Sequence, residues 1–239
     1  MPHASRLCVA VVLPSYNPAA GWSHRLAPWV ESLARAMPAV DWTFAVVDDG
    51  STVPPVEEAR QLEARLPNVR WIAYQPNCGK GFALRTGFEA VAQADCFLFT
   101  DIDLPYTEAS VLAVVSALTD GRADVAVGVR DASYYAQIPW RRRVLSLVLR
   151  RTLTVLLRLP VDDTQCGLKG FNRAGWAVFQ RTRINEFLFD VEFLRLAGRE
   201  RGLRVVAVPV ELRPQVELSA IGAGVLLREL VNLWRIWRT

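Results

Sequence analysis

The chain has 239 residues, 51% of them hydrophobic, which is enough for one large domain with a full apolar core. Its formal net charge of +4 is mild, so we expect no nucleic-acid partner. The four cysteines lack C-x-x-C spacing and the two histidines are isolated, which favours reduced cysteines in a cytoplasmic protein, and no apolar run reaches the about 18 to 20 residues of a membrane-spanning helix.

Strand-like and helix-like segments alternate through the first 130 residues. Short apolar runs predict strands at residues 7–13, 42–47, 69–74, 96–100 and 124–129, and the segments between them predict helices at 22–37, 54–66, 81–92 and 108–118. This order predicts an α/β fold with a mostly parallel sheet and helices on both faces. No internal repeat or low-complexity linker divides the chain, so we expect a single domain over residues 1–239.

The second half changes in character. We expect helices at 140–159, 174–180, 189–201 and 221–237, a glycine-containing segment at 162–171 and a strand at 204–208. The helix at 140–159 carries six arginines and no acid, so it is either a solvated helix, a helix packed on the sheet or an interfacial helix on an anionic membrane. Trp234 and Trp237, one turn apart, add aromatic anchors, and we therefore favour membrane contact.

Two acidic clusters follow predicted strands. Asp48 and Asp49 come after the strand at 42–47, and Asp101 and Asp103 come after the strand at 96–100. Ligands bind at the carboxyl ends of strands in open α/β sheets, and a D-x-D pair suits Mg²⁺ or Mn²⁺ shared with substrate phosphates. An acidic turn would explain one cluster alone, but two clusters favour an enzyme that handles a nucleoside diphosphate.

Three further motifs combine glycines or charges. Lys80 is one of only two lysines and lies between Gly79 and Gly81 at a predicted helix start, which suits either an anion site or a simple glycine-rich cap. The segment at 162–171 mixes acid, amide and base, and we favour a site there over a turn. The acids at 190 and 192 suit either a site or stabilisation of a helix N-terminus.

In order and spacing, these motifs resemble the family-2 glycosyltransferases of GT-A (Rossmann-like) fold, in the polyprenyl-phosphate branch of dolichyl-phosphate glucose and mannose synthases. The resemblance covers nearly the whole chain and rests on these landmarks: Leu13-Pro14-Ser15-Tyr16-Asn17, Asp48-Asp49-Gly50-Ser51, Asn77-Cys78-Gly79-Lys80-Gly81, Asp101-Ile102-Asp103, Asp163-Thr164-Gln165-Cys166-Gly167-Leu168-Lys169 and Phe189-Asp190-Val191-Glu192. It implies a nucleotide-sugar half at 1–130, an acceptor half at 131–218 and a C-terminal amphipathic helix at 219–239, with interfacial helices in the C-terminal half.

The resemblance also implies roles for individual residues. The nucleotide-sugar pocket would use Pro14, Tyr16, Asn17, Asp48, Asp49, Lys80, Asp101, Gln165 and Lys169. Mg²⁺ or Mn²⁺ would lie on Asp101 and Asp103, and Arg130, Arg142 and Ser146 would hold the acceptor phosphate. The candidate catalytic residues are Asp103, Asp163, Asp190 and Glu192. Pro105 departs from the family, whose members often carry Gln, His or Ser there, so a third direct protein ligand to the metal is not expected.

The implied function is inverting transfer of a hexose, glucose favoured, to a polyprenyl phosphate on the inner face of the membrane. The donor would be UDP-glucose, with GDP-mannose as the other candidate, and a membrane partner protein or a homo-oligomer stays open. One alternative is a family-2 enzyme that acts on a hydroxyl acceptor in polysaccharide or glycolipid synthesis and needs Asp190 or Glu192 as a base. A second alternative, favoured only by Pro105, is a non-catalytic scaffold recruited to the membrane.

Overall fold

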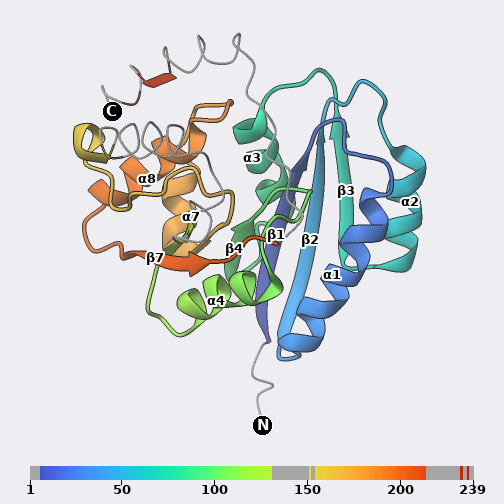
Figure 1. The fold of residues 1–239 in the computed structure, drawn as a ribbon, viewed down its shortest axis with the longest axis horizontal. Helices are drawn as coiled ribbons and strands as arrows, with labels where there is room; N and C mark the ends of the chain where they lie inside the picture. The colour runs from blue at the N-terminus through green and yellow to red at the C-terminus, as the bar shows by residue number, and fades with distance from the viewer. Residues whose placement is uncertain (1–5, 131–150, 152–153, 214–231, 234–235, 237–239) are drawn as a thin grey trace.

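The protein is built on a seven-stranded sheet with helices on both faces (Figure 1). The computed structural model describes residues 6–130, 151, 154–213, 232–233 and 236. The strands are β1 (Leu7–Ser15), β2 (Val40–Asp49), β3 (Val69–Tyr74), β4 (Cys96–Phe99), β5 (Val125–Arg130), β6 (Lys169–Asn172) and β7 (Val205–Val210), in the order β3-β2-β1-β4-β6-β5-β7. The helices are α1 (Trp22–Ala36), α2 (Val56–Arg65), α3 (Lys80–Ala90), α4 (Glu108–Thr119), α7 (Arg173–Phe179) and α8 (Phe189–Arg199).

Most neighbouring strands are parallel, which confirms the predicted α/β class. β1 pairs in parallel with β2 and β4, β2 pairs in parallel with β3, and β5 pairs in parallel with β7. β1 is an inner strand, and its apolar residues from Val9 to Leu13 are almost completely buried because helices cover both faces. The parallel register brings Ser15 level with Asp48, so the carboxyl ends of β1 and β2 reach the same edge of the sheet.

Alternate residues of β1 feed two separate core layers. Val9, Val11 and Leu13 face a layer formed with α1, α2 and α4, whereas Ala10 and Val12 face a layer formed with α3, α7 and α8. The second layer is rich in aromatic rings, with Phe88, Phe97, Phe99, Phe171, Trp176, Phe179 and Phe193 in mutual ring contact. These rings fix α3, α7 and α8 on the face from which Lys80 and Asp190 approach the sheet edge.

β6 lies antiparallel between β4 and β5, at the end of the segment predicted at 162–171. Lys169 pairs with Phe99 on one side and with Val127 on the other, so the last residues of that segment are part of the sheet. Gly170 suits this place because a Cβ there would lie 3.0 Å from the side chains of Leu118 and Val114 on α4. The last residues of the predicted segment therefore form an inner strand of the sheet, and α7 follows this strand directly.

Two predicted helices, at 140–159 and 221–237, fall largely outside the described residues, and Arg142 and Ser146 lie there as well. Within the described part of the chain, no helix has both the length and the apolar character needed to cross a membrane.

Candidate active site

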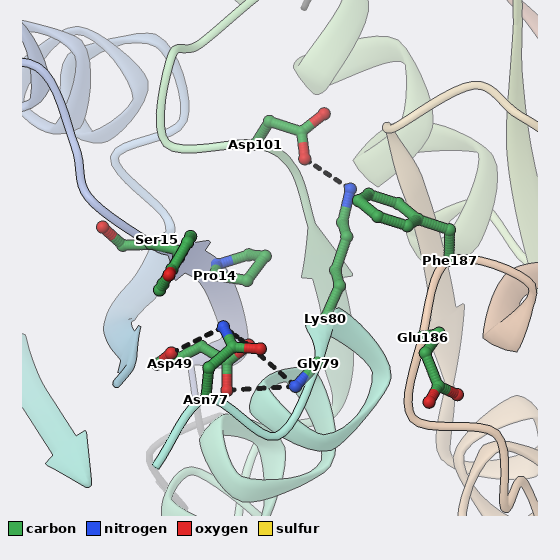
Figure 2. A pocket seen from close by; sticks show the side chains of 10 residues that line it. Pro14, Ser15, Asp49, Asn77, Gly79, Lys80, Asp101, Glu186 and Phe187 are labelled. Atoms are coloured by element: carbon green, nitrogen blue, oxygen red, sulfur yellow. Dashed lines mark hydrogen bonds and ion pairs between the residues drawn. The ribbon is translucent and has the colours of Figure 1, made fainter. Parts of the chain in front are cut away.

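A cavity of about 380 Å³ opens at the carboxyl ends of β1, β2 and β4 (Figure 2). It is lined by Pro14, Ser15, Tyr16, Asp49, Asn77, Gly79, Lys80, Asp101, Glu186 and Phe187. Five residues of the predicted nucleotide-sugar site thus meet here, although they come from four separate parts of the sequence. The parallel sheet explains this meeting, because it delivers the residues after each strand to one edge.

Asp49 holds the turn that leads into α3. Its carboxylate accepts hydrogen bonds from the backbone N–H groups of Cys78, at 2.8 Å, and Gly79, at 2.9 Å. It also accepts from the Asn77 side-chain amide at 2.9 Å and from the Tyr74 hydroxyl at 2.8 Å. Burial and the hydrogen bond to Asp49 raise the pKa of Tyr74. Asp49 therefore fixes the backbone from which Lys80 enters the cavity.

Asp48 and Asn17 lie beside the cavity and are not among its lining residues in the described chain. Asp48 is buried and accepts hydrogen bonds from the backbone N–H and the hydroxyl of Ser51. The Asn17 side-chain Oδ1 accepts a hydrogen bond from the backbone N–H of Thr52 at 2.8 Å, and the Asn17 backbone N–H donates to Ser51 Oγ at 2.8 Å. Both side chains thus shape the loop after β2.

Lys80 and Asp101 form an ion pair across the cavity (Figure 2). Burial lowers the pKa of Lys80, but the charge of Asp101 and its hydrogen bond outweigh burial, so the pKa is raised and the side chain stays cationic. Gly167 permits this arrangement, because a Cβ there would lie only 2.4 Å from Asp101 Oδ2. The cation at the start of α3 is placed where an anionic ligand would meet the helix N-terminus.

The carboxylates of Asp101 and Asp103 suit a divalent cation. Both are accessible, since Asp101 is partly exposed and Asp103 is exposed. Mg²⁺ is usually held by one or two carboxylates, with substrate phosphates and water completing the shell, so this donor set fits it. The described residues include no cluster of three or more His, Cys, Asp or Glu side chains that could hold a metal without such help.

Lys169 and Asp190 form a buried ion pair, and Asp190 also interacts electrostatically with Lys80. Lys169 Nζ is 0% exposed and donates to the carbonyls of Thr164 and Cys166, at 2.9 and 2.6 Å, and to Asp190 Oδ2 at 3.2 Å. Burial raises the pKa of Asp190 against the pull of Lys169 and Lys80. Its second oxygen, Oδ1, has no hydrogen-bond partner among the described residues. Lys169 thus holds the 164–166 turn, and Asp190 keeps one free acceptor.

Arg130 and Asp163 pair with one another at the end of β5. The guanidinium of Arg130 donates to both carboxylate oxygens of Asp163, at 2.9 and 2.8 Å, and the Arg130 backbone N–H adds a third bond at 3.0 Å. Asp163 is 1% exposed, whereas Gln165, two residues later, is exposed. Arg130, which was predicted to hold the acceptor phosphate, and Asp163, which was predicted to be catalytic, therefore form a bidentate ion pair with one another.

Glu192 anchors a segment that the sequence motifs did not include. Its Oε2 accepts the backbone N–H groups of Arg183 and Ile184, both at 2.8 Å, just before the residues that line the cavity. The Gly81 N–H binds the Asn185 carbonyl at 2.6 Å, and a Cβ at Gly81 would lie 2.4 Å from the Ile184 carbonyl oxygen. Close backbone packing thus fixes this segment against α3.

Glu186 and Phe187, carried by this segment, form the wall of the cavity opposite Pro14 and Ser15 (Figure 2). Sequence reasoning missed both residues. The sequence signal was weak, because Phe187 follows the polar Asn185 and Glu186 but runs directly into the apolar Leu188 and Phe189; in the structure Phe187 is 49% exposed.

Comparison with known proteins identifies the family of this chain. Residues 10–179 match the sequence model of Glycosyl transferase family 2. The chain belongs to glycosyl transferase family 2. Glycosyltransferase AglD of Haloferax volcanii is 32% identical over 209 residues, which cover 87% of this chain and 33% of AglD. Dolichyl-phosphate beta-glucosyltransferase ALG5C of Trichomonas vaginalis is 29% identical, and the match covers 87% of this chain and 64% of that protein. Dolichyl-phosphate beta-glucosyltransferase of Saccharomyces cerevisiae is 28% identical, and the match covers 84% of this chain and 66% of that protein.

This family 2 chain thus spans about a third to two thirds of the length of these curated relatives. Solved structures share its GT-A-like fold. Mannosyl-3-phosphoglycerate synthase from Rubrobacter xylanophilus, 17% identical, has a TM-score of 0.70 over 97% of this chain and 73% of that protein. A mannosyltransferase from Pyrobaculum calidifontis in complex with GDP-Man and Mn²⁺, 18% identical, has a TM-score of 0.59 over 84% of this chain and 54% of that protein.

Proposed function

We propose that this family 2 glycosyltransferase moves a hexose, glucose favoured, from a nucleoside diphosphate sugar to a polyprenyl phosphate, with inversion at the anomeric carbon. The observation that carries the proposal is the Lys80–Asp101 pair inside a cavity at the carboxyl edge of the sheet. The relatives named dolichyl-phosphate beta-glucosyltransferases support a polyprenyl phosphate acceptor and glucose as the sugar. We take UDP-glucose as the first donor to test, and the structural neighbour in complex with GDP-Man keeps GDP-mannose as the other.

The diphosphate of the donor would bind to the Lys80 ammonium and to the N-terminus of α3. The nucleoside would lie toward Pro14, Tyr16 and Asp49, which line the same cavity. Bound Mg²⁺ or Mn²⁺ on Asp101 and Asp103 would neutralise charge on the departing diphosphate. The Lys80 ammonium, whose pKa is raised, would keep its proton and stabilise the same charge.

A phosphate acceptor removes the need for a strong general base. The second pKa of a phosphate monoester is about 6, so the nucleophile is already anionic at neutral pH. Arg130, oriented by Asp163, would meet this phosphate, together with Arg142 and Ser146 from the segment beyond the described residues. Catalysis would take place at the cytoplasmic face of the membrane, where the lipid presents its phosphate.

The remaining predicted residues would position either the substrates or the wall of the cavity. Asp190 has one unpartnered oxygen for a sugar hydroxyl, and Lys169 would hold Asp190 in place. Glu192 would act through the segment at 183–187, and Gln165, which is exposed, would contact the sugar or acceptor directly.

The test is organic extraction of label after incubation with radiolabelled UDP-glucose or GDP-mannose, Mg²⁺ or Mn²⁺, and undecaprenyl or dolichyl phosphate. Label in the lipid phase that depends on the metal supports the proposal and identifies the donor. Absence of lipid label with every donor and metal would overturn it.

A hydroxyl acceptor is the second candidate. Asp190, whose pKa is raised by burial and whose buried Oδ1 has no hydrogen-bond partner among the described residues, would then serve as the base. In that case Asp190→Asn would abolish turnover and remove an ionisation from the pH profile. If the acceptor is a phosphate, Asp190→Asn should reduce turnover less and leave the pH profile unchanged.

A further inference from the structure

Residues near the C-terminus pack beside the wall of the cavity. Ile236 is 1% exposed and belongs to the core layer of α3, α7 and α8, against which Leu233 also packs. Asn232 is 3% exposed, and its side-chain Nδ2 donates a hydrogen bond to Glu186 Oε2 at 3.1 Å. A residue more than 40 positions away in sequence therefore contacts the side chain of a cavity-lining acid.

The backbone around Glu186 is fixed, so its side chain is the part that can move. Arg85 donates to the Ile184 carbonyl at 3.0 Å and to the Asn185 side chain, and the Gly81 N–H holds the Asn185 carbonyl. In Figure 2 the Glu186 carboxylate points away from the amino group of Lys80. The contact with Asn232 therefore selects the direction of this carboxylate.

The direction matters because Glu186 and Lys80 line the same cavity. A carboxylate turned toward Lys80 would compete with an anionic ligand for the ammonium and repel that ligand as well. Lys80 already has one carboxylate partner, Asp101, and a second would oppose diphosphate binding further.

We propose that Asn232 is a positioning residue for the donor site: it holds the Glu186 carboxylate away from Lys80 and so keeps the ammonium available to a nucleoside diphosphate. This inference rests on the proposed function, and it adds Asn232 to the residues that shape the donor site.

The test is the affinity of UDP and of GDP, with Mg²⁺ present, measured by isothermal titration calorimetry on the full chain. Asn232→Ala frees the Glu186 carboxylate, and we expect Kd to rise about fivefold, which corresponds to the about 1 kcal/mol of a partly exposed ion pair. Glu186→Gln removes the competing charge, so the double variant Asn232→Ala with Glu186→Gln returns to the wild-type Kd within about twofold.

Asn68→Ala is the matched control, because Asn68 donates a single hydrogen bond to the Trp42 carbonyl, at 3.3 Å, and does not line the cavity. Its Kd stays at the wild-type value. If Asn232→Ala leaves Kd unchanged, or if Glu186→Gln does not restore a weakened Kd, the positioning role is overturned while the proposed function stands. If the wild-type chain binds neither UDP nor GDP, the proposed donor site itself is overturned.

Discussion

Removing the Asp49 carboxylate should both lower the stability of the fold and abolish binding of the donor nucleotide. Asp49→Ala leaves the N–H groups of Cys78 and Gly79 and the polar groups of Tyr74 and Asn77 without their acceptor. Each hydrogen bond to a charged group contributes about 1.5–3 kcal/mol, but water in the cavity can replace part of the lost bonding. We therefore expect the free energy of unfolding to fall by about 3–5 kcal/mol, well below the full sum.

Urea denaturation followed by circular dichroism measures this loss, and calorimetric titration with UDP measures the site. The control is Asp41→Ala, which breaks an exposed pair with Arg6 at 3.3 Å and should cost about 0–1 kcal/mol. We expect Asp49→Ala to lose UDP binding at temperatures where it is still folded, since the turn before Lys80 is released. An unfolding free energy equal to that of Asp41→Ala would refute this reasoning.

Three further predictions concern separate parts of the molecule. Gly81→Ala should lower the free energy of unfolding by about 1–3 kcal/mol and weaken UDP binding, because its Cβ would lie 2.4 Å from the Ile184 carbonyl oxygen; unchanged denaturation and Kd would contradict this. The hydrogen bond and charge of Arg204 lower the pKa of Asp124 to about 2, so its contribution to stability is complete above the unfolded pKa of about 3.9 and is lost as pH falls toward 2. Asp124→Asn should remove this pH dependence from acid-denaturation curves, and curves parallel to wild type would refute the assignment. Asp103→Ala should leave stability within about 0.5 kcal/mol, since the side chain is exposed, but remove most metal-dependent transfer; near wild-type transfer in saturating Mg²⁺ would show that Asp103 is not a metal ligand.

The parallel half of the fold was predictable because its signals are local. Each strand from Leu7 to Arg130 is a short apolar run, and each helix between strands differs from its prediction by two residues or fewer at either end. β6 was not predicted as a strand, because Lys169–Asn172 is four residues long, contains a glycine and has no alternating pattern. Its place between β4 and β5 follows from pairing with residues that are distant in sequence.

The site was predictable where a motif ended a strand or began the helix that follows one. Pro14, Tyr16, Asp49, Lys80 and Asp101 meet as the sheet topology requires. Side-chain partners were not predictable: nothing in the sequence signals that Asp163 would pair with Arg130 or that Lys169 would be enclosed by carbonyls. Glu186 and Phe187 were missed because their place depends on contacts between the preceding residues and α3, made by the Arg85 side chain and the Gly81 backbone across about 100 residues of sequence.

Transfer to a phosphate acceptor is best tested with two acceptors that differ only in the phosphate. Purified protein with Mg²⁺ and radiolabelled donor is offered either a polyprenyl phosphate or the matching polyprenol, and label is counted in the lipid extract. We expect transfer to the polyprenyl phosphate and none to the polyprenol, because an anionic acceptor needs no added base. Equal transfer to both, or transfer to the polyprenol alone, would contradict it.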